Sequence, residues 1–236
     1  MKNFTNTYIF TFSAVMVVIV AAVLSIVAMN LQPIQQKNIE TNKKQNILLS
    51  LNIQSTKDDA LDKYDRYIVD SYVINHEGER KEDVNAFDVD LAKEVDKDLE
   101  NRNLPIYVGS VEEGAKQYVI PVSGKGLWGR IWGFVALEDD FNTIYGANFS
   151  HKSETPGLGA EIANRPFQKQ FIGKKIFDEQ GEFVSVNVIK GDAPADAPHA
   201  VDGISGGTIT SDGVDKMLED IIGLYLPYIE QMKKNN

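Results

Sequence analysis

The sequence predicts an α+β protein with a single N-terminal transmembrane helix, followed by a mostly antiparallel sheet with flanking helices. Three observations lead to this expectation. Residues 8–31 are almost wholly apolar. Strand-like runs follow one another between residues 104 and 190, which is typical of an antiparallel sheet rather than of alternating strands and helices. Apolar residues near the C-terminus recur at helical spacing.

The first predicted element is a membrane anchor over residues 1–36. Lys2 is the only charged residue before Lys37. The twenty-four residues 8–31 would form a helix of about 36 Å, enough to cross a bilayer and contact its lipids. Because no Ala-x-Ala site follows and the chain has no cysteine, we expect an uncleaved single-pass anchor rather than a signal peptide.

The next predicted region, residues 37–104, is a membrane-proximal stalk followed by an acidic α/β segment. Apolar positions within 37–51 continue the helical pattern, and residues 64–75 are strand-like before a turn at Asn75–Gly78. The charged segment that follows permits a helix around residues 89–99.

The third predicted region, residues 105–236, holds most of the strands. Strands are expected over 117–122, 127–137, 141–149 and 183–190, a helix over 164–173, and an exposed loop over 191–199. The amphipathic C-terminal pattern predicts a helix that begins near Ser211 or Asp212.

The composition argues against several classes of function. A formal net charge of −10 disfavours nucleic acid as a partner. The absence of cysteine removes thiolate iron–sulfur ligation and catalytic thiols. The three histidines are widely separated, so no metal site and no catalytic acid–base constellation is predicted.

The run Gly124–Gly129 matches the dinucleotide pattern G-x-G-x-x-G, which needs a strand before it and a helix after it. The residues that follow are aromatic and β-branched, which favours a strand. We therefore interpret this run as a hairpin turn.

The segment Asp202–Ser211, Asp-Gly-Ile-Ser-Gly-Gly-Thr-Ile-Thr-Ser, points to a phosphate. Its glycines allow close approach of a bulky ligand, and a helix start offers unpaired N–H groups and a positive dipole end. Thr208 places a hydroxyl in the middle of the segment. The alternative is an ordinary glycine-rich helix cap.

The segment Glu154–Gly159, Glu-Thr-Pro-Gly-Leu-Gly, predicts a tight apolar loop whose amides could meet the carbonyl oxygens of a flavin ring. The alternative is an ordinary turn. Lys175 could offset a phosphate charge, or it could be a solvated lysine.

These segments resemble one protein family. Asp202–Ser211 is similar to the flavinylation motif of FMN-binding subunits of redox-driven ion pumps, with Gly207 in place of the family's alanine. The segments 126–137 and 154–177 resemble the C subunit of Na⁺-translocating NADH:quinone reductases. One departure is His151-Lys152-Ser153, where the family commonly has a shorter His-Gly.

The resemblance implies one FMN, joined covalently through its phosphate to Thr208 by a separate flavin transferase that uses FAD. It implies an electron relay in a Na⁺-pumping NADH:quinone oxidoreductase, with other subunits as partners, including the flavin-bearing B subunit. It also places the anchor in the bacterial inner membrane and the soluble domain on the periplasmic side. The residues expected to bind the cofactor are Glu154, Thr155, Pro156, Gly157, Leu158, Gly159, Lys175, Ser205, Gly206, Gly207, Thr210 and Ser211.

Two alternatives stay open at this point. One is the G subunit of an Rnf-type ferredoxin:NAD⁺ oxidoreductase, which carries the same flavin chemistry. The other is a membrane-anchored interaction module with no cofactor.

Overall fold

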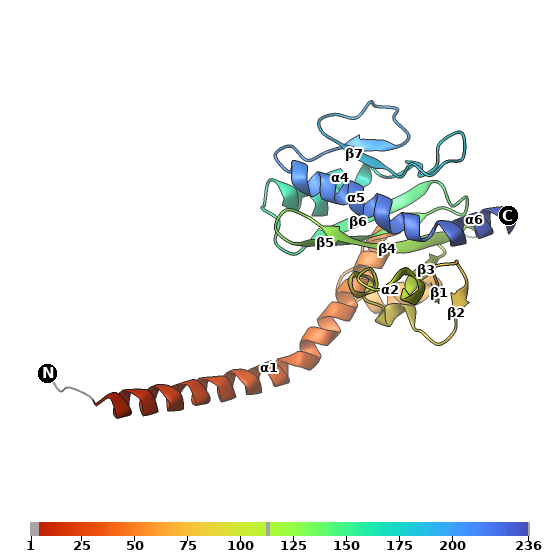
Figure 1. The fold of residues 1–236 in the computed structure, drawn as a ribbon. Helices are drawn as coiled ribbons and strands as arrows, with labels where there is room; N and C mark the ends of the chain where they lie inside the picture. Colours follow the sequence, from red (N-terminus) through yellow and green to blue (C-terminus); the bar gives the residue numbers. More distant parts are fainter. Residues whose placement is uncertain (1–4, 112–113, 236) are drawn as a thin grey trace. The chain divides into compact units, whose positions relative to one another are not determined.

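The computed structural model describes residues 5–111 and 114–235 (Figure 1). The chain forms two compact units that divide between Lys43 and Lys44. The second unit holds the sheet and the candidate site.

The first unit consists of the greater part of helix α1 (Asn6–Ser50), which includes Pro33. Among the described residues, α1 is the one helix long and apolar enough to cross a membrane. This agrees with the predicted anchor and with the predicted helical continuation after residue 36. The last turns of α1, with Ile47 and Leu48, are buried in the second unit.

The second unit is built on a six-stranded antiparallel sheet, ordered β2-β1-β3-β4-β5-β6. The predicted fold class, a mostly antiparallel sheet with helices after one apolar helix, is therefore confirmed. The sheet crosses the predicted boundary at residue 104, because β1 pairs with β3. The strands are β1 (Ile68–Ile74), β2 (Arg80–Lys81), β3 (Leu104–Gly109), β4 (Gln117–Lys125), β5 (Arg130–Leu137) and β6 (Ile144–His151).

Both faces of the sheet are covered, so the buried strands carry apolar residues on each side. Along β4, Ile120 faces one core and Val119 the other. The larger core packs against α5 (Thr208–Leu224) and α6 (Leu226–Asn235), and Figure 1 shows α5 lying along the sheet. The smaller core includes Ile47 and Leu51 from the end of α1 and the residue that follows it.

Short elements connect the strands. They are the helices α2 (Ala60–Tyr67), α3 (Leu91–Glu94) and α4 (Arg165–Lys169), the 3-10 turns η1 (Ala86–Asp88), η2 (Leu99–Asn101) and η3 (Gly159–Ala163), and a parallel pair of strands, β7 (Asn187–Ile189) and β8 (Ala200–Asp202). The helix expected around 89–99 is thus reduced to α3, and the strand expected over 183–190 to β7.

The predicted start of the C-terminal helix was wrong by one turn. Helix α5 begins at Thr208, because Gly207 is the N-cap residue and its carbonyl accepts a hydrogen bond from the N–H of Ser211. The amphipathic pattern marks apolar residues that face the core, and the buried residues of the first turn, Thr210 and Ser211, are polar, so this turn does not contribute to it.

The run Gly124–Gly129 does form a hairpin connection. It joins β4 to β5, and the N–H of Gly126 donates to the carbonyl of Gly129 at 2.8 Å. A strand follows this run rather than a helix, as the interpretation as a hairpin turn requires.

Candidate functional site

Three segments that are far apart in the sequence meet where β4 ends and β5 begins. They are the turn 126–129 between β4 and β5, the loop 152–159 after β6, and the start of α5. The pairing of Lys125 with Arg130, and of Ile131 with His151, brings the first two together. The start of helix α5 lies at the same end of these strands, because Gly213 contacts the backbone of Lys125 and Gly126.

The hydroxyl groups of the segment 202–211 divide into two kinds. Ser205 and Thr208 are exposed, whereas Thr210 and Ser211 are buried. The Thr210 hydroxyl donates to Glu154 at 2.6 Å, and the Ser211 hydroxyl oxygen accepts from the N–H of Ile204 at 2.9 Å. Thr210 and Ser211 therefore hold the segment in place through these bonds, and the expectation that they also bind a cofactor stays a prediction.

Thr208 is the first residue of α5 and presents its side chain to solvent. The N-cap residue Gly207 has no side chain, so no capping hydrogen bond satisfies the N–H groups of the first turn. Gly206 adopts a φ of +73°, which suits glycine. The exposed hydroxyl thus stands beside amide donors and a positive dipole end, an arrangement that suits a phosphate ester.

The loop 154–159 packs directly against the segment 205–207. A Cβ on Gly206 would lie 2.6 Å from Cδ2 of Leu158, and a Cβ on Gly207 would lie 3.2 Å from the N of Gly159. Leu158 is itself 42% exposed. The loop therefore offers an apolar side chain next to the glycines that precede Thr208.

The tight loop is confirmed, but part of the amides expected to meet a flavin ring are hydrogen-bonded within the protein. The N–H of Gly157 donates to Glu161, and those of Leu158 and Ala160 both donate to the carbonyl of Thr155. The tight turn uses these donors internally. Thr155, Pro156 and Gly157 remain exposed, and Gly157 has a φ of +75°.

Glu154 lies at the centre of the three segments and is only 4% exposed. Its Oε2 accepts from Thr210, and its Oε1 accepts from the N–H of Trp128 at 2.8 Å. Burial raises the pKa of the Glu154 carboxyl, but hydrogen bonds from Thr210 and from the N–H groups of Trp128, Leu127 and Gly129 outweigh it and hold the pKa below its ordinary value. Both oxygens of Glu154, which was expected to contact the cofactor, thus already accept hydrogen bonds from the protein.

His151 has a defined role. Its Nδ1 accepts the N–H of Glu154 at 3.1 Å, which fixes the start of the loop. His151 thus contributes to the position of Glu154 despite the longer His151-Lys152-Ser153 spacing.

Two residues that the sequence reasoning did not place in the site belong to its surroundings. Leu127 is 46% and Trp128 is 66% exposed, although both are large and apolar. Core packing therefore does not explain Trp128. The available signal was the Gly-Leu-Trp-Gly sequence itself, because an exposed tryptophan in a turn often marks a binding surface.

The backbone of Lys175 lies beside the start of β6, whereas the loop 152–159 follows the end of that strand. The backbone of Lys175 pairs with Thr143, before the start of β6, and its carbonyl accepts from His199. At ~3.3 Å per residue, the chain runs about 26 Å from Thr143 to His151 along β6, so the backbone of Lys175 lies far from His151. A contact between Lys175 and a phosphate at Thr208 therefore stays a prediction that these pairings do not support.

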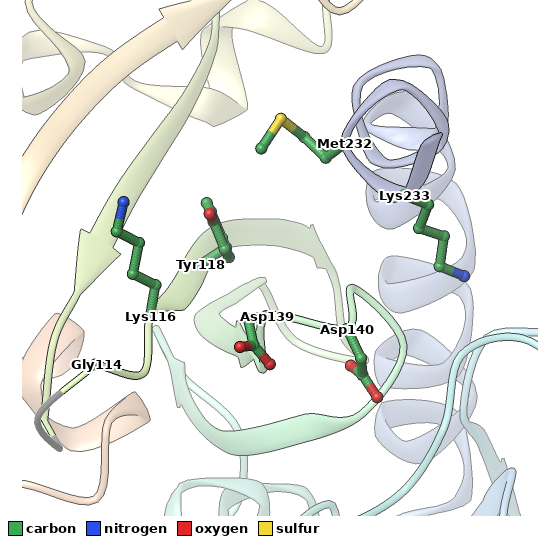
Figure 2. A pocket seen from close by; sticks show the side chains of 7 residues that line it. All are labelled: Gly114, Lys116, Tyr118, Asp139, Asp140, Met232 and Lys233. Atoms are coloured by element: carbon green, nitrogen blue, oxygen red, sulfur yellow. The ribbon is translucent and has the colours of Figure 1, made fainter. Parts of the chain in front are cut away.

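A separate hollow of about 630 Å³ lies near the other end of β4 (Figure 2). It is lined by Gly114, Lys116, Tyr118, Asp139, Asp140, Met232 and Lys233. The Asp140 carboxylate accepts from the N–H groups of Asn142 and Thr143 and from the Thr143 hydroxyl. The pKa of Asp140 is lowered because these bonds outweigh the burial that would raise it. This hollow carries charges of both signs and is remote from Thr208.

Comparison with known proteins points to the same three segments. Residues 126–223, which contain all three segments, match the model of the FMN-binding domain family. The C subunit of the Na⁺-translocating NADH-quinone reductase of Haemophilus ducreyi is 34% identical over 91% of this chain and 90% of that protein. The corresponding protein of Vibrio anguillarum is 41% identical over 50% of this chain and 46% of that protein.

Two crystal structures have the same fold. The C subunit of the Na⁺-translocating NADH-quinone reductase from Parabacteroides distasonis matches with a TM-score of 0.78 and 42% identity, over 84% of this chain and 96% of that one. NqrC of Shewanella oneidensis matches with a TM-score of 0.72 and 26% identity, over 84% and 99%. The chain belongs to the NqrC family, the C subunits of Na⁺-translocating NADH-quinone reductases.

Proposed function

We propose that this chain carries one FMN, esterified through its phosphate to Thr208, and relays electrons within a Na⁺-pumping NADH:quinone oxidoreductase. The observation that carries the proposal is the contrast along one helical turn. Thr208 is exposed at the head of α5, while Thr210 and Ser211 are buried and hydrogen-bonded. Thr208 is thus a hydroxyl that an enzyme in solution could reach.

The attachment step needs a flavin transferase and FAD. The Thr208 Oγ1 attacks the phosphorus next to the riboflavin side of FAD, and a new O–P bond forms. The bond to the bridging oxygen of the pyrophosphate breaks, AMP leaves, and the hydroxyl proton passes to solvent. The first-turn N–H groups of α5 would stabilise the charge on the esterified phosphate.

Bound FMN supplies reversible electron transfer. In the proposed relay, electrons arrive from an upstream iron centre and leave to a flavin on the B subunit. The residues of this chain would hold and orient the group: Leu158 offers an apolar contact beside Gly206, and Trp128 and Leu127 expose further apolar surface nearby. The relatives' name favours this function over an Rnf-type G subunit, as does the Leu127-Trp128 pair, because it lies in the segment 126–137 that resembles the C subunit and the Rnf G subunit lacks Leu-Trp at this point.

The test is in-gel flavin fluorescence of the denatured full-length chain after expression with a flavin transferase. Thr208→Ala should remove the covalent flavin and leave the fold intact, because an exposed first-turn side chain contributes within about 0.5 kcal/mol to stability. Ser205→Ala, at the other exposed hydroxyl, is the control and should stay fluorescent. A fluorescent Thr208→Ala band would refute the assignment.

We also propose that the domain after the anchor lies on the periplasmic side of the inner membrane. The lysines at 37, 43 and 44 favour the cytoplasm by the positive-inside rule, but large domains can be translocated regardless. A covalent link makes most sense where no pool of free cofactor is available. A phosphatase that is active only in the periplasm, fused after Asn236, should give activity. Fluorescence from a reporter that matures only in the cytoplasm would contradict this placement.

A further inference from the structure

The Glu154 carboxylate is built into the junction of three chain segments. It is 4% exposed, and each of its oxygens accepts a hydrogen bond from a different segment. Oε1 accepts the N–H of Trp128 in the turn 126–129 at 2.8 Å, and Oε2 accepts the hydroxyl of Thr210 in α5 at 2.6 Å. A carboxylate used in this way has little capacity left for a cofactor.

Two glycines from different segments make room for it. A Cβ on Gly126 would lie 2.7 Å from Oε1 of Glu154, and a Cβ on Gly159 would lie 2.7 Å from Oε2 and closer still to Oγ1 of Thr210, which bonds that oxygen. Neither glycine has a positive φ, so backbone conformation does not explain them. The close approach of the Glu154 carboxylate explains why there is no room for a side chain at either position.

The Thr210 bond fixes how the first turn of α5 is rotated. An α-helix turns about 100° per residue, so residues two apart point in roughly opposite directions. With Thr210 held inward by Glu154, Thr208 is held outward, and Thr208 is indeed exposed while Thr210 is 1% exposed. Burying a carboxylate costs free energy unless the group is fully hydrogen-bonded. Here the hydrogen bonds that offset this cost also hold the first turn of α5 in a defined orientation.

We propose that Glu154 is a positioning residue: acting through Thr210, it sets the direction in which the Thr208 hydroxyl is presented to the flavin transferase. In this role Glu154 acts on the Thr208 hydroxyl only through Thr210 and does not need to contact the transferred group. The inference rests on the proposed attachment at Thr208, and it replaces the expected role of Glu154 as a direct cofactor ligand.

The experiment measures the rate of covalent flavin incorporation into the full-length chain in detergent. The chain is produced without a transferase and is then mixed with purified transferase and FAD. Thr210→Val keeps the size of the side chain but removes the hydroxyl. We expect its rate constant at saturating FAD to fall about tenfold or more, because misplacing a reacting group by ~1 Å is that damaging. Half-saturation by FAD should stay unchanged.

Three further variants complete the set. Thr210→Ser restores the hydroxyl and should incorporate flavin within about twofold of the parent rate, since the bond to Glu154 is restored. Glu154→Gln should be slow, because its amide N–H₂ would face protein donors. Glu161→Gln, the matched control, changes a less buried carboxylate on the same stretch that accepts from Gly157, and it should leave the rate unchanged.

The outcomes separate this inference from the proposed function. Parental rates for folded Thr210→Val and Glu154→Gln would overturn the positioning role while leaving Thr208 as the attachment residue. Fluorescence of Thr208→Ala would instead refute the attachment itself. Should Thr210→Val melt below the assay temperature, Glu154→Gln asks the same question, and unchanged far-UV circular dichroism is required of each variant compared.

Discussion

The hydroxyl groups of Tyr72 and Tyr228 lie 2.5 Å apart and join strand β1 to helix α6. Both side chains are buried, and burial raises the pKa of each hydroxyl, so both stay neutral at physiological pH. Each ring also lies beside another aromatic ring or a cation: Phe141 is next to Tyr228, and Arg80 stacks over Tyr72. This contact connects the last helix to the edge region of the sheet.

The pair predicts a non-additive double-mutant cycle. Tyr72→Phe and Tyr228→Phe should each lower the free energy of unfolding by about 1–3 kcal/mol, because each leaves one buried hydroxyl without its partner. The double variant should lose less than the sum, since no unpaired hydroxyl remains. Urea unfolding measures all four chains, and simple additivity would contradict a direct bond.

Gly126 provides a test of the cradle around Glu154. Gly126→Ala would place a Cβ 2.7 Å from Oε1 and 3.0 Å from Cγ2 of Ile131, so it should reduce stability by about 1–3 kcal/mol. Gly129→Ala is the control in the same turn, because its Cβ would meet only the exposed Ser153 hydroxyl and the Cβ of Lys152, and it should cost less than about 0.5 kcal/mol. Equal effects in thermal melts would argue against the cradle.

The lowered pKa of Glu154 predicts a pH-dependent contribution to stability. A carboxyl whose folded pKa lies below its ordinary value of 4.5 stabilises the fold above that pH, and the contribution is lost as pH falls through the folded pKa. Glu154→Gln should therefore be about 1–3 kcal/mol less stable than the parent at pH 7, and the difference should shrink below pH ~4.5. Urea midpoints at several pH values check this, and a difference that is constant with pH would disprove it.

Leu158 is predicted to contact the flavin ring. Leu158→Asp should shift the visible spectrum of the bound flavin and lower its midpoint potential, because a nearby negative charge disfavours reduction, while covalent attachment continues. Ile172→Asp is a matched control, since Ile172 is 43% exposed and its neighbour Gly173 bonds Ile144 at the opposite end of β6. An unchanged spectrum and potential for Leu158→Asp would show that the loop does not contact the flavin ring.

Much of the fold could be predicted from local pattern. The charge-free run before Lys37, the hairpin at Gly124–Gly129 and the succession of strands depend on neighbouring residues, so they can be read directly. The start of α5 could not, because the residues that its first turn buries, Thr210 and Ser211, are polar and carry no apolar signal. The pairing of β1 with β3 joins residues that are 30 to 41 positions apart, from Ile74 with Leu104 to Ile68 with Gly109, so no short stretch of sequence reports it.

The site shows the same division. The resemblance singled out Thr208 as the attachment residue, but only the structure shows that its side chain is exposed while Thr210 and Ser211 are buried. Glu154 carried the chemistry expected of a ligand, yet its partners come from segments 26 and 56 residues away. Lys175 is close to the site's loop in sequence but belongs to the other end of a strand.

Thr208 heads a helix that lies along β4, with Gly213 against Lys125 and Met217 against Gly124. The base of any tether fixed there cannot shift unless the sheet shifts with it. A group bonded to Thr208 would therefore search only a small sphere whose radius is its own linker length. The fraction of chains that carry this group would depend on whether attachment had taken place, and no longer on the concentration of free flavin around the protein.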